Sequence, residues 1–365
     1  MTSGTPAANT LTAAWAATVT GPTVLSGAGV YPLLHLLATA AAGPARDELQ
    51  AVAPAPLALP VGDAVRAAVG LWPRAGVPLN PAWQDLVAGV LSGDRAPLDA
   101  WAAEQTGGLI PAMPVQVTGD TLLVLASALT VTTTWEQPFT DGLLSGGAGP
   151  WSGAWLAGLH RFQATTDPVA VVTPAAGALA GRPLTTVTVR GGDGIDVVLL
   201  LGEPGAAAGD VLAAGIETPR TAPGALWGPG ISVGRGGGPP GLFLQLPRFT
   251  VDGGHDLLAH AALFGLRTAT DAGRGHFPGI GPQPLAVSQG AQAATASFTA
   301  LGFRAAAVTA LGTRAGGRMP EDHEQVHVVL DRPFGFLTVH RPTGLVLFAG
   351  WVDGQAVRAP NGTRL

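Results

Sequence analysis

One run of residues has the types and spacing of a known catalytic site. His323-Glu324-Gln325-Val326-His327 matches the His-Glu-x-x-His pattern of zinc proteases, in which an α-helix brings both histidines to one face and the glutamate to the metal-bound water. Here the flanking residues are Pro320 and the largely β-branched run 326–330, which predict a loop leading into a strand. Residues four apart in a strand lie about 13 Å apart, too far to share one zinc ion. We therefore expect no metal site here.

Other chemistry-bearing patterns are also weak. The chain has no Cys, so it has neither disulfides nor a thiolate nucleophile. His255 and His260 are five apart, which suits a metal pair on neither a helix nor a strand, and the Gly-rich run 234–241 lacks the spacing of a dinucleotide site and predicts a turn. The nine Trp are interpreted as packing residues. The sequence thus predicts no catalytic residue, no metal, no cofactor and no enzyme.

Composition narrows the range of partners. Only 12% of the residues are charged, the net charge is -5, and all 19 cationic residues are Arg, with no basic run. These features predict neither nucleic acid nor an anionic membrane as a partner. Residues 1–20 lack the basic and apolar regions of a secretory signal, and no stretch reaches the roughly 18 apolar residues of a membrane span. We expect a cytoplasmic protein, with export of a trimmed chain left open.

The elements that must position any site follow a helices-first, strands-later order. Residues 24–49 predict one or two buried helices, Asn80-Pro81 a helix start, and residues 98–106 a helix that stops at Gly107-Gly108. Residues 64–72 are either a strand or an amphipathic segment, and 255–266 predict a further helix. The predicted strands are 122–126, 129–134, 185–189, 197–201, 242–246, 326–330, 335–340 and 345–352. This order predicts an α+β fold, and no linker divides the chain.

Several blocks resemble the serpin family. The run Arg332-Pro333-Phe334-Gly335-Phe336-Leu337, followed by Thr343-Gly344-Leu345-Val346-Leu347-Phe348-Ala349-Gly350, is similar to the serpin signature. Ser127-Ala128-Leu129-Thr130-Val131 with Trp135-Glu136-Gln137-Pro138-Phe139 resembles a second family block, and further blocks between residues 77 and 288 follow the family's order. The resemblance, of a prokaryotic type, implies one serpin domain over 1–365. That fold has N-terminal helices on a large central β-sheet, smaller sheets, and an exposed reactive-centre loop at about 302–325.

The resemblance also implies a function. A serpin is a metastable suicide inhibitor: a serine protease cleaves the exposed loop and forms an acyl-enzyme, and the freed hinge strand then enters the central sheet and traps the protease. Aligning the family's hinge with this chain places it at Gly302, Phe303, Arg304, Ala305, Ala306, Ala307, Val308 and Thr309. The cleaved bond is expected at Arg318-Met319, with Arg314-Ala315 as the alternative. The partner would be a trypsin-like or subtilisin-like serine protease, and the protein a monomer.

Departures from the family pattern leave a second function open. Phe303 stands where the family has Thr or Ser, and Arg304 replaces a hinge acid. In the region that controls sheet opening, Ser26 is kept, while Ser127 and Gln292 stand where the family has Asn and His. Trp135 is expected beneath the point where the loop enters the sheet. If these changes block insertion, the protein would be a non-inhibitory binding or structural serpin that proteases cleave as a substrate.

Overall fold

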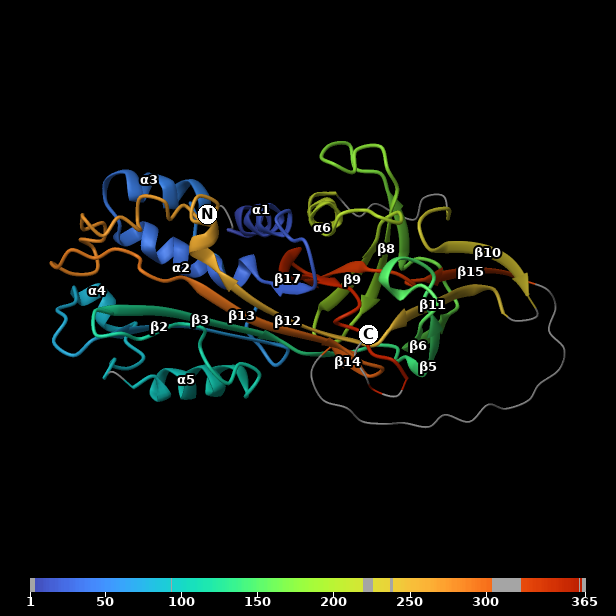
Figure 1. The fold of residues 1–365 in the computed structure, drawn as a ribbon, viewed down its shortest axis with the longest axis horizontal. Coiled ribbons are helices and arrows are strands. Elements are labelled where there is room, and N and C mark those ends of the chain that lie inside the picture. The colour runs from blue at the N-terminus through green and yellow to red at the C-terminus, as the bar shows by residue number, and fades with distance from the viewer. Residues whose placement is uncertain are drawn as a thin grey trace.

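The computed structural model describes residues 4–92, 94–218, 226–236, 239–303, 323–360 and 362 of the chain (Figure 1). The helices are α1 (Thr5–Ala16), α2 (Gly27–Ala40), α3 (Gly43–Val52), α4 (Pro81–Gln84), α5 (Ala96–Thr106) and α6 (Ala208–Glu217), with short 3-10 turns at Gly149–Trp151 and Leu257–His260. The strands are β1 (Thr23–Leu25), β2 (Val65–Pro73), β3 (Leu123–Val131), β4 (Thr133–Thr134), β5 (Thr140–Ser145), β6 (Trp155–Gln163), β7 (Val169–Val172), β8 (Leu184–Arg190), β9 (Ile195–Leu201), β10 (Ile231–Gly236), β11 (Gly241–Pro247), β12 (Phe249–Asp256), β13 (Ala291–Phe298), β14 (Gly302–Phe303), β15 (His323–Val329), β16 (Phe334–His340) and β17 (Leu345–Val352).

A six-stranded sheet in the order β1-β17-β16-β9-β8-β7 forms the centre of the core. Every residue of β9 and β17 is buried, which explains why both sequences are almost entirely apolar, with Asp196 of β9 as the exception, because a strand covered on both faces has little need of polar residues. Helices α1, α2 and α6 pack against this sheet. From β12, Phe249 contacts Phe334 and Phe336 of β16, with ring centroids 5.6 and 5.2 Å apart, and so packs a second sheet against the first.

That second layer is divided into two pieces. One piece is the pair β2-β3, and the other is a four-stranded sheet in the order β12-β13-β14-β4. Side chains of β3 alternate between two cores, because successive residues of a strand point to opposite faces. Leu123 and Leu125 pack toward the main core with α2, whereas Val124 and Ala126 join Trp72 and α5 in a separate apolar cluster. The divided layer therefore lies between α2 on one face and α5 on the other.

A five-stranded sheet in the order β10-β15-β11-β6-β5 completes the fold at the other end of the molecule (Figure 1). Phe303 ends β14 and His323 begins β15, so the residues on either side of 304–322 lie in different sheets. The expected loop boundaries of 302–325 are therefore too wide, because Gly302-Phe303 belong to β14 and residues 323–325 to β15.

The α+β arrangement is confirmed, and several expectations about single elements need correction. Residues 255–266 are not a helix: β12 continues to Asp256, whose side chain accepts a hydrogen bond from the Leu258 N–H and starts only a 3-10 turn. The Gly-rich run predicted as a turn lies partly in β10 and begins β11. Helix α5 ends as expected, because Gly107 adopts the left-handed conformation with φ 62°. None of the described helices has the length and apolar character needed to cross a bilayer.

The contact between the two layers predicts a test of the core. We expect Phe249→Ala to lower the free energy of unfolding by about 3–5 kcal/mol, because it removes a fully buried ring that contacts three other phenylalanines. The matched control is Trp155→Ala, since Trp155 is 59% exposed, and it should change stability by less than about 0.5 kcal/mol. Denaturant unfolding followed by circular dichroism measures both. Equal effects of the two substitutions would contradict this account.

Candidate functional site

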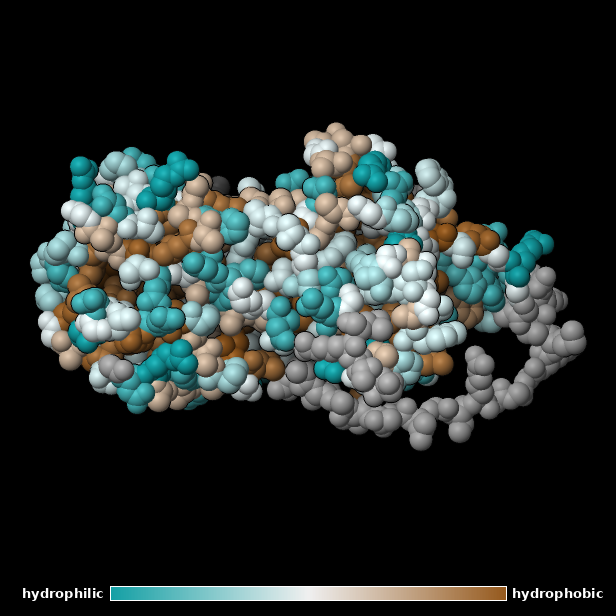
Figure 2. Space-filling view, in the orientation of Figure 1, coloured by the Kyte–Doolittle hydropathy of each residue, from teal (hydrophilic) through white to brown (hydrophobic). Residues whose placement is uncertain are grey.

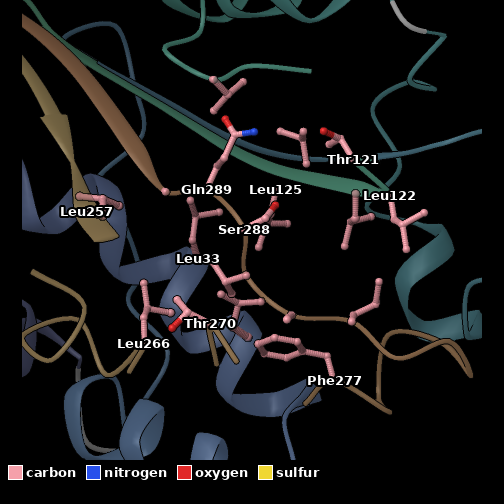
Figure 3. A pocket seen from close by; sticks show the side chains of 18 of the residues that line it. Leu33, Thr121, Leu122, Leu125, Leu257, Leu266, Thr270, Phe277, Ser288 and Gln289 are labelled. Atoms are coloured by element: carbon pink, nitrogen blue, oxygen red, sulfur yellow. The ribbon is translucent and has the colours of Figure 1, made fainter. Parts of the chain in front are cut away.

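The two strands beside the expected insertion site are separated by a groove. We use this name for the space between β3 and β13. Strand β3 pairs with β2 along its whole length, whereas β13 pairs with β12 and, at Phe298, with β14. The groove contains a cavity of about 290 Å³, surrounded by side chains from α2, β3 and the segment before β13, including Leu33, Leu125 and Phe277 (Figure 3). Its walls are mainly apolar, and the edge of β3 that faces into it pairs with none of the described strands.

The first two residues of the expected hinge, Gly302 and Phe303, form β14 at one end of the groove, which we call its head. Gly302 and Phe303 of β14 pair antiparallel with Thr134 and Thr133 of β4, and Phe303 also pairs with Phe298 of β13. A two-residue turn at 300–301 makes this possible, because the Thr299 N–H donates to the Gly302 carbonyl at 2.9 Å. A Cβ atom on residue 302 would lie 2.3 Å from the carbonyl oxygen of Thr133. The close approach of β14 to β4 therefore requires glycine at this position.

Phe303 points into the core rather than blocking the groove. Its side chain is 3% exposed, and its ring centroid is 5.9 Å from that of Phe336. The bulky residue at this hinge position is thus accommodated by the layer below. Arg304, Ala305, Ala306, Ala307, Val308 and Thr309, and the candidate bonds Arg318-Met319 and Arg314-Ala315, lie outside the described residues.

Trp135 supports the turn that precedes β14. Its indole N–H donates to the carbonyl of Thr299 at 2.9 Å, and its backbone N–H donates to that of Leu301 at 3.0 Å. The ring is buried and lies 4.5 Å from the ring of Phe298. Trp135 therefore lies beside the turn that leads into β14. Its expected position beneath the point where the loop enters the sheet stays a prediction.

Ser26 and Gln292 join the two layers at the middle of the groove. The side-chain amide of Gln292 accepts from the Ser26 N–H at 2.8 Å and donates to the Ser26 carbonyl at 2.9 Å. The Ser26 hydroxyl donates to the carbonyl of Leu347 and accepts from the Gly29 N–H, which caps α2. Ser127 lines the same small void of about 30 Å³ from the β3 side. The structure thus brings Ser26, Ser127 and Gln292 together, while Trp135 lies at the head of the groove.

The arrangement of helices and sheets in this chain matches a known fold. Residues 241–353 match the family model described as serpin (serine protease inhibitor). Solved structures match over nearly the whole chain. Native protease nexin-1 with heparin has a TM-score of 0.72 and 18% identity, covering 96% of this chain and 98% of that one. This chain has the serpin fold. The resemblance to the serpin family is confirmed, and serpins are generally protease inhibitors rather than enzymes.

Two further serpins have similar folds. Serpin48 from the insect Tenebrio molitor, described as highly specific, gives a TM-score of 0.69 at 16% identity, with 95% of this chain and 96% of that one covered. A serpin from the trematode Schistosoma haematobium gives 0.67 at 14% identity, with 95% and 98% covered. No curated protein sequence matches this chain. At these identities, the structural similarity establishes the fold.

Sequence reasoning missed a strap across the groove. The strap, residues 107–122, connects α5 to β3, and its Met113 and Val115 line the main cavity. The side chain of Gln289 accepts from the Gln116 N–H at 2.7 Å and donates to the Gln116 carbonyl, tying the strap to the segment before β13. Two glutamines 173 residues apart in irregular segments carry no sequence signal of such a contact. A strand entering the groove would have to displace this contact.

The His-Glu-x-x-His run lies in β15, as its flanking residues predict. His327 stacks on Phe243 with ring centroids 5.0 Å apart, and no group of three metal-ligating side chains occurs in the described part of the chain. A second motif was overlooked: Gly230-Ile231-Ser232-Val233-Gly234 has the Gly-x-Ser-x-Gly spacing of hydrolases. That chemistry needs a strand-to-helix elbow, whereas Ser232 lies within β10, opposite His327. Neither motif has the geometry of a catalytic site.

Burial lowers the pKa of two side chains, and both have structural roles. Burial lowers the pKa of His255, whose Nε2 lies 3.0 Å from the Thr23 hydroxyl and from the Val24 carbonyl, so the neutral ring ties β12 to β1. Burial also lowers the pKa of Arg161 to about 10, and its guanidinium lies 4.4 Å above the ring of Phe139. Both groups therefore have structural roles.

The tight fit at residue 302 predicts the effect of a single added methyl group. We expect Gly302→Ala to displace β14 and lower the free energy of unfolding by about 1–3 kcal/mol, because the Cβ would collide with the Thr133 carbonyl. Leu301→Ala is the control in the same turn, since Leu301 is 38% exposed and should cost less. Denaturant unfolding compares the two variants. If Gly302→Ala is as stable as the wild type, β14 does not pack as described.

Proposed function

We propose that this serpin inhibits a serine protease by loop cleavage, covalent trapping and insertion of the hinge as a new strand between β3 and β13. The observation that carries the proposal is the position of β14 at the head of the groove. Gly302 and Phe303 run antiparallel to both neighbouring strands, which is the direction that continued insertion requires. The hinge would therefore lengthen an existing strand rather than start a new one.

The register of β14 supports the fit of the remaining hinge residues. Continued in step from Phe303, the strand would place Ala305 opposite Val131 and Ala296, Ala307 opposite Leu129 and Ala294, and Thr309 opposite Ser127 and Gln292. Alternate residues of a strand share a face, so these three side chains would point toward the core with Phe303. Small side chains suit that face, because Val131, Leu129, Ala294 and Ala296 already fill the core there.

Two terms would favour the inserted state. The edge of β3 that faces the groove would gain a hydrogen-bonding partner along its length, and each such bond contributes about 0.5–1.5 kcal/mol net. The strand would also cover apolar side chains that line the cavity. The uncut protein would then be metastable, held from its lower free-energy state by the attachment of both loop ends.

The chemical step belongs to the protease. Its serine oxygen attacks the carbonyl carbon before the cleaved bond, the C–N bond breaks, and the new amine leaves with the segment that continues into β15. The carboxyl side stays attached to the protease as an ester, at the end of the hinge strand. Insertion of that strand would carry the protease along the groove and distort its active site before water hydrolyses the ester.

We propose that the protease cleaves the bond between Arg318 and Met319, with the bond between Arg314 and Ala315 as the alternative. An Arg at this position fits a protease pocket with a buried carboxylate, so the partner we infer is trypsin-like, with subtilisin-like proteases as the second candidate. The alternative function is a non-inhibitory serpin that is cleaved as a substrate. It is favoured by Arg304 in the hinge, and the experiment below separates the two.

We expect incubation with trypsin to give a covalent complex that survives denaturing electrophoresis. Arg318→Ala should abolish this complex if trypsin cleaves after Arg318.

Ala307→Arg should convert the inhibitor into a substrate, raising the number of serpin molecules consumed per protease by about tenfold or more, because an unpaired charge would be buried. Ala306→Arg is the matched control, since residue 306 would face outward opposite Thr130 and Thr295.

Thermal unfolding gives a second readout of the same proposal. We expect a large rise in the unfolding midpoint after loop cleavage, because the freed strand would fill the groove. Clean cleavage with neither a complex nor a rise in the midpoint would favour the non-inhibitory alternative and would remove the insertion mechanism.

A further inference from the structure

The main cavity, of about 290 Å³, is lined by apolar side chains that are not fully buried. Leu33 of α2, Leu125 of β3 and Val287 before β13 are each half-buried, and Leu122 is 38% exposed. Figure 3 shows Leu33, Leu125 and Phe277 reaching the cavity from three segments of the chain. Figure 2 shows hydrophobic residues at the surface of the end of the molecule where β3 begins. The cavity is therefore both apolar and open to solvent.

The size of the cavity limits what it can hold. A water molecule takes about 30 Å³ and needs two to four polar partners, so apolar walls around a space for about ten waters hold them poorly. An apolar cavity of about 150 Å³ binds benzene, which has six carbon atoms. At the same ratio, this cavity takes about ten to twelve carbon atoms. Its walls favour a hydrocarbon chain, because the burial of each CH₂ group is favourable.

One acidic residue determines which charge the mouth of the cavity prefers. Asp120 lines the cavity and is exposed, and its carboxylate forms no ion pair among the described residues. Arg74, which donates to the carbonyls of Thr118 and Thr121 nearby, is not part of the wall, and none of the described residues that line the cavity is Arg or His. A cationic head group would pair with this carboxylate, whereas an anionic one would be repelled by it.

The cavity also lies on the path of the proposed hinge strand. Continued in step from Phe303, that strand would place Leu311 opposite Leu125, on the face that points toward the core. The Leu311 side chain would then fill part of the cavity. A hydrocarbon chain bound there takes the same space, so the ligand and the inserting strand would exclude each other.

We propose that the main cavity binds one linear aliphatic amine of about ten to twelve carbon atoms, with its ammonium group at Asp120, and that the bound amine delays entry of the hinge strand. The binding site stands on the described residues alone. The delay rests on the proposed insertion mechanism, because only an inserting strand would compete for the cavity. Such a ligand would favour cleavage as a substrate over trapping.

The first test measures binding to the uncut chain by isothermal titration calorimetry, with probes kept below their micelle-forming concentrations. We expect one site per chain for decylamine, and weaker binding of decanol and decanoate. Asp120→Asn should lower the affinity for decylamine about two- to fivefold, to that of decanol, because an exposed ion pair is lost. Asp85→Asn is the matched control, since Asp85 is also exposed and does not line the cavity.

A second set of variants tests where the hydrocarbon chain lies. Leu125→Trp adds bulk inside the cavity and should lower the affinity for decylamine by about tenfold or more. Ser288→Trp adds bulk from the segment before β13 and gives the same test if Leu125→Trp does not fold by circular dichroism. Leu143→Trp is the matched control and should bind like the wild type, since Leu143 is 55% exposed in β5 of the five-stranded sheet.

The third test measures competition with insertion. Trypsin is mixed with the chain in the presence and absence of decylamine at ten times its dissociation constant, when about one chain in eleven is free of ligand. Because the ligand must leave first, we expect insertion to slow about tenfold, so that more serpin molecules are consumed per protease. Leu125→Trp in the same two solutions is the control, since any effect of decylamine on trypsin itself appears there too.

The outcomes separate this proposal from the one it rests on. If decylamine shows no saturable binding, or binds the wild type, Leu125→Trp and Ser288→Trp equally, the site is wrong. Equal affinities for decylamine and decanoate overturn the role of Asp120. Saturable binding without a change in the number of serpin molecules consumed overturns the delay. If loop cleavage gives neither a complex nor a rise in the midpoint, the insertion mechanism is wrong, while the titrations still decide on the site.

Discussion

The edge of β3 with which no described strand pairs is the constraint on which the rest of the structure depends. Backbone N–H and C=O groups in a protein interior are almost always paired, and a strand edge without a partner is a place where another strand can add. Here that edge faces an apolar cavity rather than open solvent. The groove is therefore suited to accept one more strand, and the surrounding elements determine which strand enters and when.

Three contacts control access to the groove from different directions. The pair Gln116 and Gln289 holds the strap across its lower half, and Ser26 with Gln292 fixes its middle to the sheet below. At the head, Trp135 supports the turn that leads into β14. Each contact joins segments far apart in the sequence.

The sequence predicted the parts of the fold whose pattern is local. Strands β9, β16 and β17 are largely apolar runs bounded by turn residues, and α5 ends at a glycine with positive φ, so both features were visible in the residue order. Helices α1 and α6 were not predicted, because Ala-rich segments have little periodic contrast. Strand β10 was missed because its glycines resemble a turn, and only its partner β15 makes it a strand. Within the site, the roles of Gln289 and Thr299 depend on tertiary contacts that no single sequence reveals.

The short strand β14 has a kinetic consequence. Forming the first contacts of an ordered segment is the slow part of many cooperative processes, while adding one residue to an existing segment is fast. With Gly302 and Phe303 already seated, a hinge freed by cleavage would begin with nucleation complete. The time to full insertion would then be set by elongation alone. This is favourable, because insertion would have to finish before water hydrolyses the ester that joins the chain to the protease.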